Sequence, residues 1–194
     1  KRASGRLPVA PMQRFDKVAL LLLLVALVLW GFLPVNAITG ITMLVAGLLH
    51  LIRLSRWAGH LTFPEPLVLV LHVGYAFVPL GALTMGAEIL MPGILGMAAA
   101  QHLWMGGAIG LMTLAVMTRA TLGHTGQSLS AGAGTVMIYA ALIVAVVARV
   151  AAGAWPAEAA ILHAVSGSAW ILAFGGFAII YGRLLLRLPT DKRI

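Results

Sequence analysis

The sequence contains no cysteine and few charged side chains for its 194 residues. Without cysteine it cannot form disulfides, iron–sulfur clusters, thiolate-ligated haem or haem attached covalently through a C-x-x-C-H motif. Charged residues make up only 9% of the chain, whereas a soluble domain carries roughly a quarter. Because 61% of the residues are hydrophobic, the expected solvent is a lipid bilayer.

Acidic residues are scarcer still, with five against 13 Lys and Arg, which gives a net charge of +8. Such a charge could indicate nucleic acid as a partner, but the basic residues lie between and beyond the apolar runs, as membrane flanks do. Most acidic residues also lie at flanks, Asp16 among them, and Glu88 near a segment end is expected to reach the headgroups. No carboxylate pair, nucleophile–base arrangement or phosphate loop is visible, so the sequence leaves open whether the protein is an enzyme.

Six apolar stretches approach the length of about 20 residues that a helix needs to cross the hydrocarbon core. Proline and glycine mark the breaks between them, as at Pro34, Pro92-Gly93 and Pro156. The pattern predicts one all-α domain over residues 1–194, a polytopic transmembrane helix bundle of about six spans. The expected spans are residues 18–35, 38–54, 67–90, 94–118, 131–152 and 159–182.

The distribution of basic residues predicts the orientation of the bundle. With the N-terminus inside, twelve of the 13 basic residues flank the inner ends of the spans, and only Arg149 flanks an outer end. Because Lys and Arg concentrate in cytoplasmic loops, both termini are expected on the cytoplasmic side. The inner residues are Lys1, Arg2, Arg6, Arg14, Lys17, Arg53, Arg56, Arg119, Arg183, Arg187, Lys192 and Arg193.

Histidines are the chemically informative residues, because polar side chains inside a bilayer are costly and mark functional sites. At 1.5 Å per residue, His50 and His72 lie at similar depths near the inner boundary, and His102 and His163 near the outer one. His124 is expected in the inner connection that follows the fourth span. The sequence thus offers an inner and an outer pair, each drawn from two helices.

Imidazole is the usual axial ligand of b-type haem and a good ligand for copper. A single intramembrane histidine is more often a helix–helix hydrogen-bond partner, but four histidines at two matched depths favour a metal. Arg53 and Arg119 gather at the inner surface, where haem propionates would need cations. Their alternative role is to set the topology. Methionines such as Met105 could bind copper, although methionine in an apolar helix is usually core filler.

The run Arg119-Ala-Thr-Leu-Gly-His-Thr-Gly126, with the preceding stretch from Gly107, resembles the most characteristic part of the NnrS family. These are bacterial membrane proteins that contain haem and copper and are linked to nitric oxide. The resemblance extends over most of residues 45–126, and within it His50, Arg53, His72, His102, Arg119 and His124 stand at motif positions. His163 lies outside this stretch, and its candidacy as a ligand depends on its depth alone.

The resemblance implies a protein of the bacterial cytoplasmic membrane that binds haem b, with copper as a second metal. Its ligand would be nitric oxide, and its role the response to nitric oxide and resistance to nitrosative stress. Turnover, sequestration and sensing of the gas are all left open. The chain would correspond to the C-terminal half of a family member, with about six further spans in an N-terminal half. Two other functions compete: a transporter or channel with a histidine proton relay, and an electron-transfer subunit of cytochrome b type.

Overall fold

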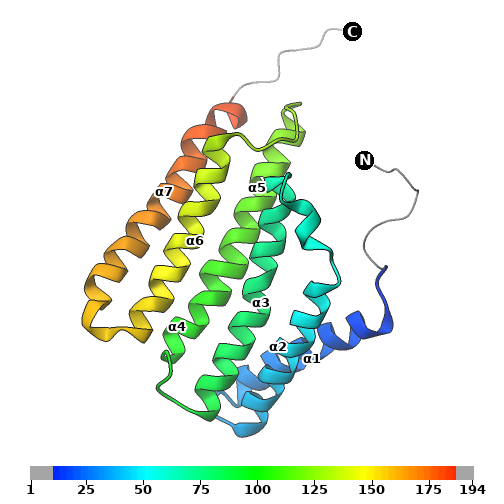
Figure 1. The fold of residues 1–194 in the computed structure, drawn as a ribbon, viewed down its shortest axis with the longest axis vertical. Helices are drawn as coiled ribbons and strands as arrows, with labels where there is room; N and C mark the ends of the chain where they lie inside the picture. The colour runs from blue at the N-terminus through cyan, green and yellow to red at the C-terminus, as the bar shows by residue number, and fades with distance from the viewer. Residues whose placement is uncertain (1–10, 187–194) are drawn as a thin grey trace.

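The computed structural model describes residues 11–186, and within that range the chain is helical and contains no strand. Figure 1 shows the helices packed as one bundle. Six helices are long and apolar enough to cross a membrane, which confirms the predicted fold class. They are α1 (Arg14–Phe32), α2 (Ala37–Ser55), α3 (Pro66–Leu90), a continuous run over Met97–His124, α6 (Ala133–Ala154) and α7 (Ala159–Leu185).

The fourth span is built from three segments in succession. The helix α4 (Met97–His102) passes into a π-helix, η2 (Leu103–Gly110), which passes into α5 (Leu111–His124). The helix of this span continues beyond residue 118, where the predicted crossing ends. A charged side chain at the interface does not end a helix, and α5 continues until Gly126 adopts a left-handed φ of +69°. Arg119 and His124 therefore lie on α5 and not in a connection.

Local signals explain the other helix ends. The helix α1 begins at Arg14, earlier than predicted, because Gln13 and Asp16 form a capping box there. It stops before Pro34, since the residue before a proline is disfavoured in the α region. The Asn36 side chain accepts a hydrogen bond of 2.8 Å from the Ile38 amide and starts α2. Short 3-10 turns, η1 (Gly59–Thr62) and η3 (Pro156–Glu158), complete two of the connections.

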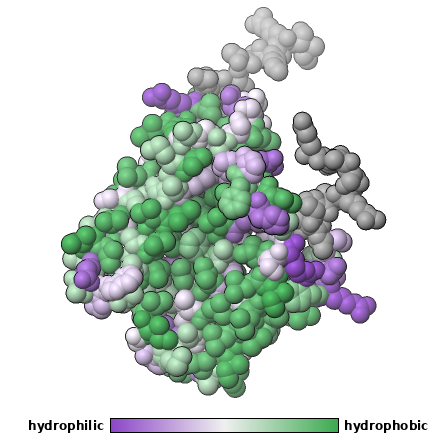
Figure 2. Space-filling model, in the orientation of Figure 1, coloured by the Kyte–Doolittle hydropathy of each residue, from purple (hydrophilic) through white to green (hydrophobic). Residues whose placement is uncertain are grey.

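The bundle has two buried clusters that share α3. The smaller one joins α1, α2, α3 and α4 around Met43 and Met85, and the larger one joins α3, η2, α5, α6 and α7 around Leu111, Leu114 and Leu142. Outside these clusters many large apolar side chains are exposed. In Figure 2 apolar residues cover most of the visible flank of the bundle. A surface of this kind is what a helix bundle presents to lipid.

Glycines permit the closest helix contacts. A Cβ added at Gly86 on α3 would lie 2.8 Å from the Gly40 carbonyl oxygen of α2, so these backbones can cross only without side chains. On η2, Cβ atoms at Gly106 and Gly110 would meet the Trp170 ring of α7 at 3.7 and 3.4 Å. These are ordinary van der Waals distances, so packing on α7 does not require glycine at either position. A Cβ at Gly106 would, however, come within 3.1 Å of Val146 on α6.

Polar contacts tie together the helix ends that the predicted orientation places inside, called the inner ends here; the opposite ends are called the outer ends. Asp16 at the start of α1 lies 3.2 Å from Arg53 near the end of α2. Thr135 at the start of α6 lies 2.6 Å from the Tyr181 hydroxyl near the end of α7. The start of α1 and the end of α7 therefore lie on the same face as the connections 56–65 and 125–132. Half of the inner basic residues lie outside the described range: Lys1, Arg2, Arg6, Arg187, Lys192 and Arg193.

The predicted orientation places this face in the cytoplasm, and cysteine labelling tests it. Cysteines replacing Ser55 and Ser128, both exposed, should resist a membrane-impermeant thiol reagent in intact cells and react after lysis. A cysteine replacing Ala157, exposed in the opposite connection, should react in intact cells and serves as the positive control. Labelling of Ser55→Cys or Ser128→Cys from outside would contradict the orientation.

Candidate functional site

The structure separates the predicted histidine ligands into four environments. His50 is enclosed between α1, α2 and α3, His72 lines a groove beside η1, and His124 lines a second groove with Arg119. His102 and His163 line one cavity near the outer end of the bundle. The outer pair is therefore brought together, whereas the expected inner pair is not.

His50 is almost completely buried, at 1% exposure, and both of its ring nitrogens are engaged. Its Nε2 lies 3.0 Å from the Ala19 carbonyl oxygen, which can only accept, so Nε2 carries the proton. Its Nδ1 then accepts from the Tyr75 hydroxyl at 2.5 Å. In this arrangement neither nitrogen presents a lone pair to a metal. The prediction that His50 is a ligand would require one of these bonds to break.

Arg53 connects this histidine to a carboxylate that sequence analysis had assigned to a flank. Its Nη1 donates to the Tyr75 hydroxyl, and its Nε donates to Asp16 at 3.2 Å. Asp16 is buried at 6% exposure and also accepts from the Gln13 amide at 2.8 Å. Asp16 lies at a helix end, as a flank residue does, but sequence analysis did not show that it is buried against Arg53 of α2 and Arg56 just after α2.

Packed aromatic rings connect Arg53 and Tyr75 with His72. The Arg53 guanidinium lies 4.8 Å from the centroid of the Trp57 ring. Trp57 packs on Tyr75 with centroids 4.4 Å apart and meets His72 edge to face at 6.0 Å. The residues Asp16, Arg53, Tyr75 and Trp57 thus form one packed assembly that fixes a wall of the His72 groove. The rings of Trp57 and Tyr75 also separate His72 from His50.

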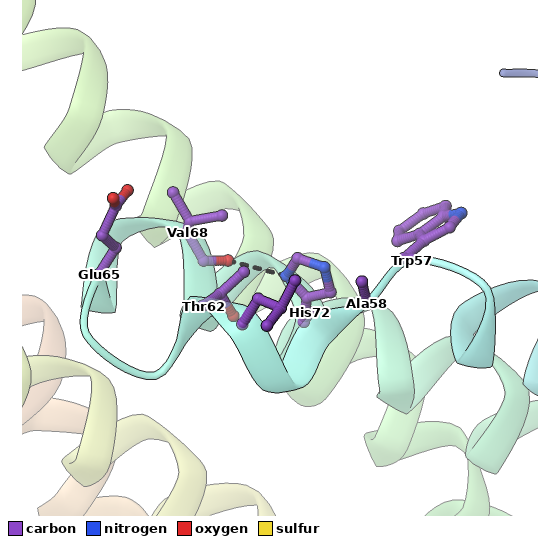
Figure 3. A pocket seen from close by; sticks show the side chains of 7 residues that line it. Trp57, Ala58, Thr62, Glu65, Val68 and His72 are labelled. Atoms are coloured by element: carbon purple, nitrogen blue, oxygen red, sulfur yellow. Dashed lines mark hydrogen bonds between the residues drawn. The ribbon is translucent and has the colours of Figure 1, made fainter. Parts of the chain in front are cut away.

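The His72 groove has a volume of about 420 Å³ and opens beside η1. Figure 3 shows the imidazole of His72 in this groove with its hydrogen bond to Val68. Because Nδ1 lies 3.1 Å from the Val68 carbonyl oxygen, Nδ1 carries the proton and Nε2 keeps its lone pair. No hydrogen bond from a described residue occupies Nε2. An imidazole whose Nδ1 proton is held by a carbonyl is the form that binds metals.

His102 shows the same arrangement on the fourth span. Its Nδ1 lies 2.6 Å from the Ala98 carbonyl oxygen, one turn earlier, and no described residue bonds to its Nε2. The cavity that it lines has a volume of about 560 Å³ and lies between the fourth span, α6 and α7. His163, Met105 and Arg149 line the same cavity. Sequence analysis had placed Arg149 only as an outer flank, and its proximity to the two histidines was missed because it comes from a third helix.

Arg119 and His124 are exposed residues at the inner end of α5. They line a groove of about 490 Å³, and Arg119 also lines an adjoining one of about 380 Å³. The second of these shares Glu65 and Val68 with the His72 groove. The groove of about 380 Å³ therefore adjoins both the His72 groove and the groove lined by His124, and Arg119 lines it. His60, in contrast, is exposed on η1 and lines none of these sites.

Glu88 does not reach the headgroups as expected. It is buried at 4% exposure and accepts hydrogen bonds from the amides of the loop between α3 and α4. Gly93 and Gly96 each donate at 3.0 Å, and Leu95 also donates. Two of these residues, Gly93 and Gly96, have positive φ angles of +101° and +81°. The carboxylate therefore fixes the loop that leads into α4 and His102.

The described residues contain no group of three or more histidine, aspartate or glutamate side chains that could hold a metal ion. The sites therefore offer one or two imidazoles each, which suits an axial ligand of haem, or two imidazoles with a thioether, which suits copper. A site built from three imidazoles or carboxylates does not occur in residues 11–186.

A comparison with known families adds one positive finding. The family model described as NnrS protein matches residues 1–188, nearly the whole chain. No curated protein and no solved structure matches the chain.

Proposed function

The chain belongs to the NnrS family, and we propose that it is a haem protein of the bacterial cytoplasmic membrane that takes part in the response to nitric oxide. The observation that carries the proposal is the shared geometry of His72 and His102. Each is partly buried on a membrane-spanning helix, holds its Nδ1 proton on the carbonyl one turn earlier and lines a cavity with Nε2 unoccupied by described residues. His50, in contrast, has both of its ring nitrogens engaged in hydrogen bonds.

The inner groove suits haem b. His72 would hold the haem iron, and Trp57 would form an aromatic wall of the groove. Arg119 in the adjoining grooves is the better candidate for a propionate partner, because Arg53 is already bonded to Asp16 and Tyr75. When bound, haem iron with a displaceable axial position would supply the site that binds nitric oxide.

The outer cavity suits copper. His102 and Met105 lie three residues apart on the fourth span, and His163 lines the same cavity from α7. A thioether is a soft ligand that favours cuprous ion, and imidazole also binds copper. The hydrogen bond to the Ala98 carbonyl fixes the ring of His102. Trp170 and Ile171 contribute apolar side chains to the lining of the cavity.

Nitric oxide is small and apolar, so it partitions into bilayers and needs no gated pore. The exposed apolar surface of the bundle lets the gas approach either cavity through lipid. His163 and Met105 are themselves exposed beside the outer cavity. This access is consistent with direct binding of the gas to an intramembrane metal.

A visible spectrum of the purified protein tests the proposal. The reduced protein should show a Soret band and sharp α-bands, and anaerobic nitric oxide should shift the Soret band in proportion to the iron bound. Cells that lack the protein should grow worse under nitric-oxide donors, and the restored gene should rescue them. A reduced spectrum that nitric oxide leaves unmoved, with unaltered donor sensitivity, would favour electron transfer. A colourless, metal-free preparation would favour transport.

A further inference from the structure

We propose that Arg149 makes the outer cavity a binding site for a small planar monoanion with two acceptor oxygens, the chemical class of nitrite and of carboxylates. This anion would be bound in addition to the metal. The choice of nitrite rests on the proposed function, because nitrite is the stable oxidised form of nitric oxide in water. The anion site itself depends only on Arg149 and the cavity that it lines.

Arg149 has no anionic partner among residues 11–186. The ion pairs of this part of the chain all involve Asp16, at the inner end of the bundle. Glu88 is committed to the loop amides. Glu65 lies at the inner grooves, and Glu158 in η3 makes no ion pair with Arg149. The guanidinium therefore contributes a charge that described side chains do not neutralise.

Arg149 also has an unusual position for a basic residue of this chain. Arg149 lies near the C-terminal end of α6 (Ala133–Ala154), where a long arginine side chain can reach either the headgroups or the cavity that it lines. It is also the one basic residue on the outer side of the predicted topology, so it opposes the charge bias that sets orientation. Neither an ion pair nor the predicted topology accounts for this residue, and its place in the lining of the outer cavity favours an anion bound there.

The outer cavity also has the chemistry that a small planar anion needs. Arg149 lines a space of about 560 Å³ together with His102 and His163, while Trp170 and Ile171 supply apolar walls. The Ser166 hydroxyl is committed to the Ala145 carbonyl at 2.7 Å and does not compete for the guanidinium. A guanidinium presents parallel N–H donors that match two oxygens on one atom. An anion held there would also offset the repulsion between Arg149 and a metal cation bound by the two histidines.

The test uses the full chain in lipid nanodiscs, with nitrite as the probe and acetate and chloride as comparisons, followed by titration calorimetry. Wild type should bind nitrite and acetate one per chain and chloride more weakly. Arg149→Gln should weaken nitrite binding at least tenfold. Arg149→Lys should weaken it less, because ammonium keeps the positive charge but lacks the two parallel N–H donors of guanidinium. Arg183→Gln, an exposed arginine at the inner end of α7, is the matched control and should bind as wild type does.

Helicity by circular dichroism and metal content, measured for every variant, show that a loss of binding is not a loss of fold or of cofactor. A lipid phosphate is the other source of a two-oxygen anion, so the titration is repeated in phosphate-free glycolipid. Equal affinity in the two lipids supports the proposal. Binding that appears only without phosphate would assign Arg149 to lipid headgroups and overturn it. Equal binding in wild type and Arg149→Gln would also overturn it, and would leave the haem proposal untouched.

Discussion

Replacing His72 by alanine should remove most of the haem from the purified protein and leave copper in place. Replacing His102 should remove copper and leave haem. Each imidazole keeps one nitrogen open towards its own cavity, and the two cavities lie at opposite ends of the bundle. Loss of a group that merely orients a ligand lowers metal affinity by about 10–100-fold, so loss of the ligand itself should cost at least about as much.

The measurement is iron and copper per mole of protein, together with the reduced absorption spectrum. His60→Ala is the matched control, because this histidine is exposed on η1 and should retain both metals. His50→Ala provides a contrasting case. If His50 only packs, its loss should lower thermal stability and leave metal content unchanged. Full content of both metals in both the His72 and His102 variants would make them packing histidines and would contradict the proposed sites.

Replacing Glu88 by alanine should destabilise the outer end of the bundle by roughly 3 kcal/mol, since three amides would lose a charged, buried acceptor. Glutamine keeps one acceptor oxygen and should be intermediate. The loop between α3 and α4 leads directly into His102, so Glu88→Ala should also loosen metal in the outer cavity more than haem in the inner groove.

Thermal unfolding in detergent measures the first effect, and metal content the second. Glu158→Gln is the matched control, because this glutamate is exposed in η3, at the same end of the bundle. An unchanged unfolding temperature in Glu88→Ala would show that water replaces the carboxylate at the loop amides at little cost.

Hydropathy predicted the six spans because a bilayer requires each crossing to be long and apolar, and no tertiary information is needed for that. The depth of each histidine along its span could also be estimated from the sequence, since residues advance along a helix by a fixed rise. The outer pair, His102 and His163, was predicted on depth alone and does share a cavity. The inner pair failed because depth says nothing about the direction in which a side chain points around its helix. His50 faces α1 and α3, and His72 faces the groove beside η1.

The polar network was beyond sequence analysis for a related reason. Asp16 and Arg53 are 37 residues apart, and no local pattern indicates that they meet. Glu88 looked like a headgroup residue because its partners are backbone amides, whose directions depend on the positive φ angles of Gly93 and Gly96. Arg149 was found only as a flank, because its cavity is assembled from three helices. The continuation of α5 beyond residue 118 was not predicted, because a charge was taken as the end of the span.

The π-helix between α4 and α5 sets an angular offset between the two ends of the fourth span. Each residue of an α-helix turns the chain by about 100°, and a π-turn closes over one residue more than an α-turn. The segment Leu103–Gly110 therefore changes the angle around the helix axis between His102 and Arg119, compared with an uninterrupted α-helix of the same number of residues. Deleting one residue there would let the helix close as an ordinary α-helix of nearly the same length. Because the π-turn accommodates the extra residue, such a deletion should leave His102 and Arg119 facing nearly the neighbours they face now. The same deletion in α5, outside the π-helix, would instead rotate the two ends of the span against each other by about 100°.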